Sequence, residues 1–359
     1  MGVVPPDYGA ARQRFREAAA HAGWALESHS VGATGPAGED LTIDVAASRA
    51  PGAARTLIVS SGLHGVEGPF GSAVQTALLE SCAADDVAPT SVRCVFVHAL
   101  NPYGFAWSRR CDAENVDPNR NFVLDERPSE ASRAAYARFD RLLNPRRPPS
   151  ALDLFYPRAI WTAAVHGLPT LKQALVTGQY EFPNGLFYGG AEPSATHRVV
   201  AEQLAGWAGG ATLVLHLDLH TGLGRWGRGK LLLDYSLSKV ERARLAEWFG
   251  AGAIEDGDPR GVAYRACGSL GPWVVSRRVA PVYLFAFAEF GTYGNLRVLA
   301  GLRAENQAHH WAAPDAPGTT RAKARLRELF CPADSAWRAR ALAGGVSLVR
   351  RAVDGLAHR

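Results

Sequence analysis

The chain has 359 residues, of which 47% are hydrophobic and 20% are charged, and its formal net charge is +5. This apolar fraction is that of ordinary globular proteins and excludes a disordered, collagen-like or low-complexity chain. Only four of the 39 basic residues are lysines, and the arginines are scattered among 34 acids, so the excess of positive charge does not indicate a nucleic-acid partner.

The cysteines and the N-terminal segment bear on the compartment. The five cysteines form no CxxC pair, and their odd number excludes a complete disulfide framework. The first residues lack the basic and apolar regions of a signal peptide. No apolar run approaches the roughly 20 residues that span a bilayer. The expectation is therefore a soluble cytoplasmic protein without a membrane partner.

The chain begins with a predicted helix and two short strands. Asp7 is a typical N-cap and Gly23 a typical stop, so a helix is expected from Asp7 to about His21. Short strands are expected at 24–31 and at 40–47, the second because apolar and polar residues alternate there.

Continuous apolar runs then predict strands that are buried on both faces. These runs cover 56–61, 92–99, 211–219, 230–234 and 282–288. Helical stretches are expected near 70–83, 131–143, 194–207, 238–250 and 294–311. The alternation of strands and helices predicts an α/β sheet covered by helices on both faces.

The domain organisation follows from the same pattern. Division of the length by about 150 residues per domain suggests two domains, but no long linker separates them. The segment 144–190 is rich in Pro, Gly and aromatic residues and is expected to form a long excursion over one face of the sheet. We expect one catalytic domain over 1–312, with 313–359 as a helical C-terminal extension packed on it.

Three residues that follow buried strands have the chemistry of metal ligands. His64 and Glu67 lie three apart, so on a helical turn their side chains would point the same way. This spacing is common, and a surface histidine before a helix-start glutamate explains it equally well. His220 ends another buried strand, and His, Glu and a distant His with one open position is the ligand set of catalytic zinc. His216, in the same strand, is better explained as a hydrogen-bonded core histidine.

Glu289 closes the apolar strand at 282–288. A carboxylate there must be hydrogen-bonded, bound to a metal or shifted in pKa, because its burial otherwise costs several kcal/mol. A glutamate of raised pKa beside a metal is what general-base hydrolysis requires.

A stretch of charged and amide residues runs from Arg109 and Arg110 to Asn119 and Arg120. It can be a solvated loop. Equally, its arginines can polarise a carbonyl and clamp a carboxylate bidentately.

Five motifs in order carry a family resemblance. HGVEG, NPYG, RRCDAENVDPNRNF, DLHTG and AEFGTYG together resemble the zinc carboxypeptidase superfamily. The stretches TGQY and GLFYGG between 177 and 190 resemble a bacterial branch of it that is related to the aspartoacylase and succinylglutamate desuccinylase enzymes. The similarity extends over about 40–312.

The resemblance implies a role for each of these residues. His64, Glu67 and His220 match three ligands of one zinc ion per chain, and Glu289 matches the general base that activates water.

Within the charged stretch, Arg110 matches the arginine that polarises the substrate carbonyl. The adjacent Arg109, a candidate substrate-binding residue, is left as an alternative for this role. Asn119 and Arg120 match the pair that binds a terminal carboxylate, and Asp117 matches a carboxylate that orients the first histidine ligand.

One position departs from the family pattern. The segment 264–274 is similar to the loop that carries a substrate-capping tyrosine in digestive carboxypeptidases, but Val274 stands where that tyrosine would be. Tyr264 is an alternative from the same loop, although an aromatic core residue is the simpler reading. Trimming of ordinary peptide C-termini is therefore in doubt.

The resemblance implies a three-layer α/β sandwich around a mixed, mostly parallel eight-stranded sheet. It implies zinc-dependent hydrolysis of an amide or peptide bond next to a carboxylate-bearing group, in a small peptide or an N-acyl amino acid. The alternatives are a deacylase of the aspartoacylase type and a zinc-binding protein without catalysis. A serine hydrolase is disfavoured, because the sequence has no GxSxG nucleophile elbow.

Overall fold

An eight-stranded sheet forms the centre of the molecule. The computed structural model describes residues 4–85, 91–124, 128–150, 152–167, 175–256 and 266–358. The strands are β1 (Ala25–Thr34), β2 (Asp40–Ala47), β3 (Arg55–Ser61), β4 (Arg93–His98), β5 (Leu213–Trp226), β6 (Gly229–Leu233), β7 (Ile254–Asp256) and β8 (Val282–Gly291). Their order is β1-β2-β4-β3-β5-β8-β6-β7. The central strands β4, β3, β5 and β8 are parallel, and antiparallel pairs flank them.

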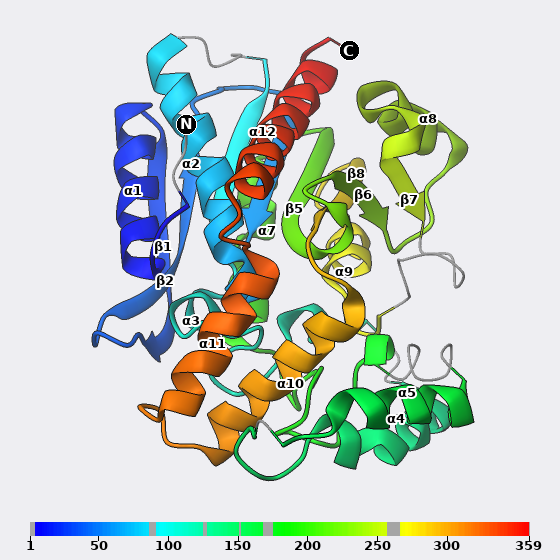
Figure 1. Ribbon diagram of the computed structural model, residues 1–359. Coiled ribbons are helices and arrows are strands. Elements are labelled where there is room, and N and C mark those ends of the chain that lie inside the picture. Colours follow the sequence, from blue (N-terminus) through cyan, green and yellow to red (C-terminus); the bar gives the residue numbers. More distant parts are fainter. Residues whose placement is uncertain are drawn as a thin grey trace.

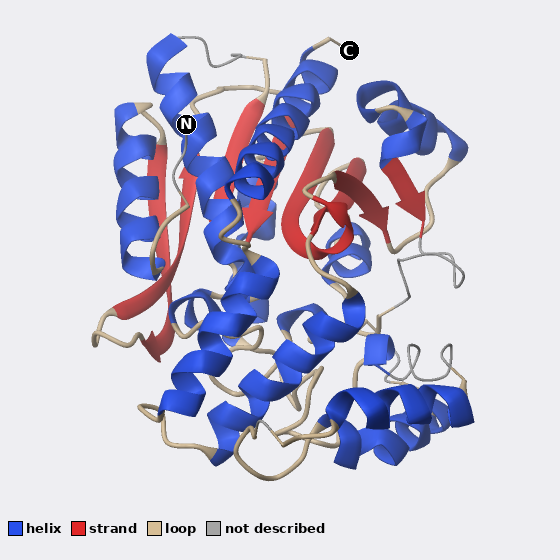
Figure 2. Ribbon diagram, viewed as in Figure 1, coloured by secondary structure: helices blue, strands red, loops and turns tan. Residues whose placement is uncertain are grey.

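Helices cover both faces of this sheet (Figures 1 and 2). The longer helices are α1 (Tyr8–His21), α2 (Gly68–Asp85), α4 (Glu130–Leu143), α5 (Phe155–His166), α7 (Ala195–Ala208), α8 (Lys239–Phe249), α10 (Asn295–Trp311), α11 (Pro317–Phe330) and α12 (Ser335–Ala357). Two short helices are α3 (Pro102–Ala106) and α9 (Leu270–Ser276), and 3-10 turns lie at η1 (Gly65–Glu67), η2 (Pro118–Arg120) and η3 (Ala251–Ala253). The three-layer α/β architecture and the mixed, mostly parallel eight-stranded sheet are as the sequence predicts.

The alternation of side chains along each strand divides the core into two layers. On β3, Leu57 and Val59 pack with α1, α2, α8 and α12 on one face. Ile58, between them in sequence, packs with α7 and α9 on the other face. Because both layers are apolar, the sequences of these strands are continuous hydrophobic runs.

Several helices begin at the predicted places, where capping side chains stand. Asp7 accepts a hydrogen bond from the Ala10 amide at the start of α1. Ser238 caps α8 in a reciprocal capping box with Glu241. These side chains satisfy amide groups that have no partner inside the helix.

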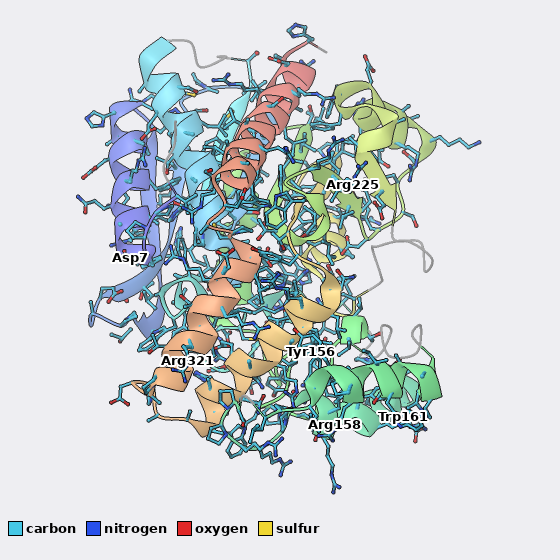
Figure 3. All side chains as sticks on the ribbon, in the orientation of Figure 1. Asp7, Tyr156, Arg158, Trp161, Arg225 and Arg321 are labelled. Carbon is cyan, nitrogen blue, oxygen red and sulfur yellow. The ribbon has the colours of Figure 1, made fainter. Side chains whose placement is uncertain are left out.

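Several elements were not predicted. β7 and α3 are too short to show a period, and α9 contains a Gly-Pro pair that reads as a turn. β5 continues to Trp226, beyond the predicted end at residue 219. α5 lies within the predicted excursion 144–190, and its Trp161 is 71% exposed and projects outward beside Arg158 (Figure 3).

The C-terminal helices pack on the same molecule. Trp337, Val349 and Leu356 of α12 are buried in the core layer that contains Leu57. Figure 1 shows α12 crossing in front of the sheet beside α2. The division of the chain at residue 312 stays a prediction. Across the described residues, no helix combines the length and apolar character that crossing a bilayer requires.

Candidate metal centre and active site

The candidate site lies at the carboxyl ends of three adjacent parallel strands. β3 ends at Ser61, and the η1 turn that follows begins directly after His64 and ends at Glu67. β5 contains His220 and β8 contains Glu289, and these two are direct register partners. Ligands in open α/β sheets bind at this edge, because the loops that follow neighbouring strands converge there.

His64, Glu67 and His220 form a buried cluster that could hold a metal ion. Their ligand atoms all lie within 4.8 Å of one another. Glu67 Oε1 lies 2.8 Å from His64 Nδ1, and Glu67 Oε2 lies 3.0 Å from His220 Nδ1. The three side chains therefore turn two imidazole nitrogens and one carboxylate toward a common point.

A carboxylate lies behind each of the two histidines. His64 Nε2 is 3.3 Å from Asp117 Oδ1, and His220 Nε2 is 2.6 Å from Asp218 Oδ2. A carboxylate that accepts the Nε2 proton leaves the Nδ1 lone pair free for a metal. The short contact with Asp218 thus favours Nδ1 as the metal-binding nitrogen of His220, and Asp117 lies on the corresponding side of the His64 ring.

Asp218 belongs to a buried chain of polar groups inside the sheet. Ser60 donates to Asp218 Oδ1 at 2.6 Å and lies 2.8 Å from His216 Nε2. His216 Nδ1 in turn lies 2.9 Å from the Tyr283 hydroxyl. His216 is thus hydrogen-bonded in the core, in line with the sequence interpretation.

The sequence analysis did not identify Asp218 as a functional residue. Its signal was present, because residues two apart on a strand share a face, and Asp218 stands two before His220. The pattern Asp-x-His on a buried strand indicates a carboxylate–histidine pair.

In the metal-free cluster, the neighbouring charges shift the pKa values of Glu67 and His220 toward the charged forms. Burial alone would raise the Glu67 pKa, but the His64 and His220 rings outweigh it and hold that pKa below its usual range. Burial would lower the His220 pKa, but Asp218 and Glu67 raise it well above its usual value. Both carboxylates therefore favour the protonated form of His220 in the metal-free protein.

Glu289 is a buried carboxylate beside this cluster. Its side chain is 8% exposed, and Oε1 accepts the Leu223 amide proton at 2.8 Å. Burial, together with the negative charge of Glu67, raises the Glu289 pKa to about 7. A carboxylate that titrates near neutral pH is suited to accept and return a proton.

The two adjacent arginines point in different directions. Arg110 Nε donates to Asp117 Oδ2 at 2.8 Å, and Nη1 lies 3.9 Å from Glu67 Oε1. Arg109 is 1% exposed and donates to Glu305 on α10 at 2.9 Å and to Asn115 at 2.8 Å. Of the pair, it is Arg110 that lies against the metal-ligand cluster.

The backbone ties this arginine pair to the metal-ligand turn. The carbonyl of Arg109 accepts the Val66 amide proton at 2.7 Å, and that of Arg110 accepts the Gly65 amide proton at 3.3 Å. The position of the Arg110 side chain is thus coupled to the turn between His64 and Glu67.

Asn119 and Arg120 lie on the η2 turn, next to Asp117. Asn119 Oδ1 accepts from the Leu270 amide at 3.0 Å and from the Ser269 hydroxyl at 3.2 Å. Arg120 Nη1 donates to the Asn119 carbonyl, and its buried Nε has no protein partner in the described part of the chain. Arg120 Nε, a buried donor without an acceptor in the described part of the chain, is thus available to an anionic ligand.

The loop where the family pattern departs is only partly described. Val274 lies on α9, is fully buried and packs in the core layer of α7 and α9. Tyr264 lies outside the described residues.

Comparisons with known proteins agree with this architecture. A family model described as "Protein of unknown function (DUF2817)" matches residues 6–344. The chain belongs to this family. A search of curated protein sequences gave no match.

Two solved structures illustrate the fold. A metallo-carboxypeptidase from Burkholderia cenocepacia matches with a TM-score of 0.51 and 12% identity, over 98% of this chain and 69% of that chain. Carboxypeptidase A from Helicoverpa armigera matches with a TM-score of 0.46 and 13% identity, over 89% of this chain and 73% of that chain. The match to the Burkholderia cenocepacia structure shows that the DUF2817 chain has a metallocarboxypeptidase-like fold.

Proposed function

We propose that this DUF2817 protein is a zinc-dependent hydrolase that cleaves an amide or peptide bond next to a carboxylate-bearing group. The observation that carries the proposal is the register pairing of His220 with Glu289, which sets a carboxylate of raised pKa beside the His64–Glu67–His220 cluster. A metal-binding triad and an adjacent base are the two parts that metal-assisted hydrolysis requires.

The donor set fits zinc. Two imidazole nitrogens and a carboxylate, with a fourth position for water or substrate, are the ligands of catalytic zinc. Asp117 and Asp218 support this assignment, because each lies behind one of the two histidines. A zinc ion held there would supply a Lewis acid that polarises a carbonyl and lowers the pKa of water.

The chain's own residues would then handle the proton and the charge. Glu289 accepts the proton of the attacking water and returns it to the leaving nitrogen as the C–N bond breaks. Arg110, held by Asp117 and close to Glu67, stabilises the negative charge that develops on the carbonyl oxygen. The hydroxyl adds to the carbonyl carbon, so the products are a carboxylic acid and an amine.

Arg120 and Asn119 are proposed to bind the carboxylate of the substrate. Burial lowers the Arg120 pKa, but a guanidinium stays charged at neutral pH. Its buried Nε, which has no acceptor among the described residues, and the amide nitrogen of Asn119 are the donors from which a carboxylate would accept. We do not assign a substrate role to Arg109, because its Nε and Nη2 donate to Glu305 and Asn115, whereas Arg110 is the arginine that lies against the metal-ligand cluster.

Metal content and hydrolysis test this function together. The purified protein should contain one zinc per chain by elemental analysis, and H64A should lose it. E289Q should keep the zinc but lose hydrolysis by about 1000-fold or more. E80Q, an exposed glutamate on α2, is the matched control and should retain both properties. Absence of stoichiometric zinc, or full activity in E289Q, would overturn the proposal.

A substrate comparison separates the two hydrolase alternatives. Short peptides with a free carboxylate and N-acyl amino acids share the chemistry and differ only in the acyl group. A larger kcat/KM for the peptides supports a carboxypeptidase, and a larger value for the N-acyl amino acids supports a deacylase. A zinc-loaded protein that hydrolyses neither class would instead support the non-catalytic alternative.

A further inference from the structure

Phe187 lies against both arginines of the proposed site. The guanidinium carbon of Arg110 is 5.5 Å from the centre of the Phe187 ring, and that of Arg120 is 5.9 Å from it. Both distances are within the range of a cation–π interaction. One aromatic ring therefore contacts the two cations to which the proposed function gives separate tasks.

The backbone holds Phe187 in a conformation that a bulky residue rarely adopts. Its φ is +58°, in the region that favours glycine. Its carbonyl accepts from the Gln179 amide at 3.0 Å, and the carbonyl of Tyr188 accepts from the Asp117 amide at 2.7 Å. These bonds hold the segment in place, and strain of this kind concentrates at functional sites.

The same segment, together with Gly268, encloses Arg120 from other sides. The Tyr180 hydroxyl donates to the Arg120 carbonyl at 2.5 Å. A Cβ added at Gly178 would lie 2.6 Å from Arg120 Cδ, and one added at Gly268 would lie 2.2 Å from the Arg120 carbonyl oxygen. Arg120 therefore has little room to move. The spacing between the guanidinium groups of Arg110 and Arg120 then depends on the Phe187 ring, which contacts both.

Simple packing does not explain why an aromatic residue stands here. Phe187 is only partly buried and packs against a mainly aliphatic cluster that includes Val66, Leu302 and Leu329. A leucine would fill such a place equally well. A leucine, however, has no π face to attract two guanidinium groups.

We propose that Phe187 is a positioning residue that sets the spacing between Arg110 and Arg120, and thereby selects substrates whose carboxylate stands one carbon from the scissile nitrogen. This inference rests on the proposed function. Arg110 would hold the scissile carbonyl and Arg120 the carboxylate, so a fixed spacing between them rejects a leaving group that is one methylene longer. Phe187 itself takes no part in bond making or breaking.

The specificity ratio is the measurement that tests this role. N-acetyl-phenylalanyl-alanine and N-acetyl-phenylalanyl-β-alanine differ by one methylene between nitrogen and carboxylate. The wild type should prefer the first in kcat/KM. F187L should reduce that preference about tenfold, because both arginines lose their ring contact. The matched control F182L removes a ring of the same segment that contacts the Tyr136 ring instead, with the two rings tilted by 39°, and should keep the preference.

A second pair of variants separates positioning from stability. F187A and F187G both lack the ring, but only glycine tolerates the positive φ. F187G should therefore melt at a higher temperature than F187A, while both show the same reduced preference. If the preference returns in F187G together with stability, or stays unchanged in F187L, Phe187 is a structural residue and the proposal is wrong.

Binding measurements keep this inference distinct from the proposed function. If the wild type hydrolyses neither substrate, the proposed function fails. Calorimetric binding of N-acetyl-alanine and N-acetyl-β-alanine then decides the role of Phe187. A preference for the α-amino acid that F187L reduces supports the spacing role, and equal binding of the two compounds overturns it.

Discussion

Arg109 Nε donates to Glu305 Oε1 at 2.9 Å, although the two residues are 196 positions apart. Their exposures are 1% and 3%, and Lys323 of α11 lies 3.3 Å from the same carboxylate oxygen. This buried group joins the segment that carries Arg110 to α10 and α11. The C-terminal helices thus contribute to the position of a residue at the proposed site.

Removal of the Glu305 charge should destabilise the protein strongly. E305Q leaves the buried Arg109 without its anionic partner, so we expect the free energy of unfolding to fall by about 3 kcal/mol in denaturant titration. The matched control is E80Q, whose partner Arg14 and own side chain are 37% and 43% exposed, and it should cost less than about 1 kcal/mol. Equal losses in the two variants would contradict this account.

The pH dependence of hydrolysis should reflect the ionisation of Glu289. The base must be ionised to accept a proton, so kcat/KM should fall as pH drops through the pKa of Glu289, which is about 7 in the metal-free protein. The positive charge of a bound metal lowers that pKa, so the acid limb should lie at or below this value. A kcat/KM profile that stays flat down to about pH 4 would exclude Glu289 as the base.

The ionisation of Glu289 should also make the stability of the metal-free protein depend on pH. The pKa of Glu289 is raised in the folded state from 4.5 to about 7, so the folded protein loses stability as pH rises between these values. E289Q lacks this charge. Its stability relative to wild type should therefore increase from pH 4.5 to pH 7, by up to about 3 kcal/mol, and then level off. Thermal unfolding of both proteins across this range measures the difference, and a constant difference would contradict the raised pKa.

Asp218 should matter to metal affinity without being a ligand. D218N removes the negative charge behind His220, so we expect zinc to bind about 10- to 100-fold more weakly in competition with a chelator. D44N is the matched control, since Asp44 is equally buried but pairs with Arg12 on α1. Unchanged zinc affinity in D218N would mean that the chain of polar groups behind His220 serves only the core.

Two glycines with the same backbone angle allow a steric test of the Arg120 environment. Gly23 and Gly268 both have φ of +69°, but a Cβ at Gly23 meets nothing within 4 Å, whereas one at Gly268 lies 2.2 Å from the Arg120 carbonyl oxygen. G23A should cost about 1 kcal/mol of stability from backbone strain alone. G268A should cost more and should also raise KM for substrates with a free carboxylate. A KM equal to that of wild type in G268A would show that Arg120 does not bind the substrate carboxylate.

Much of the fold could be predicted from local patterns. The buried strands, their alternation with helices and the caps of α1 and α8 depend on neighbouring residues, so periodicity and capping signals reveal them. Short or atypical elements such as β7, α5 and α9 were missed, because they carry no full period or are stabilised by contacts far along the chain.

The sequence by itself determined which residues could form the site. His64, Glu67, His220 and Glu289 stand at the ends of buried strands, and the geometry of parallel strands then brings them to one edge. Only the tertiary structure decided which way each side chain faces. It directed Arg110 to the cluster and Arg109 to Glu305, because adjacent residues in a loop have no fixed direction until distant partners select one. It also brought Phe187 to both arginines of the site, a contact across 67 and more residues of chain that no local pattern encodes.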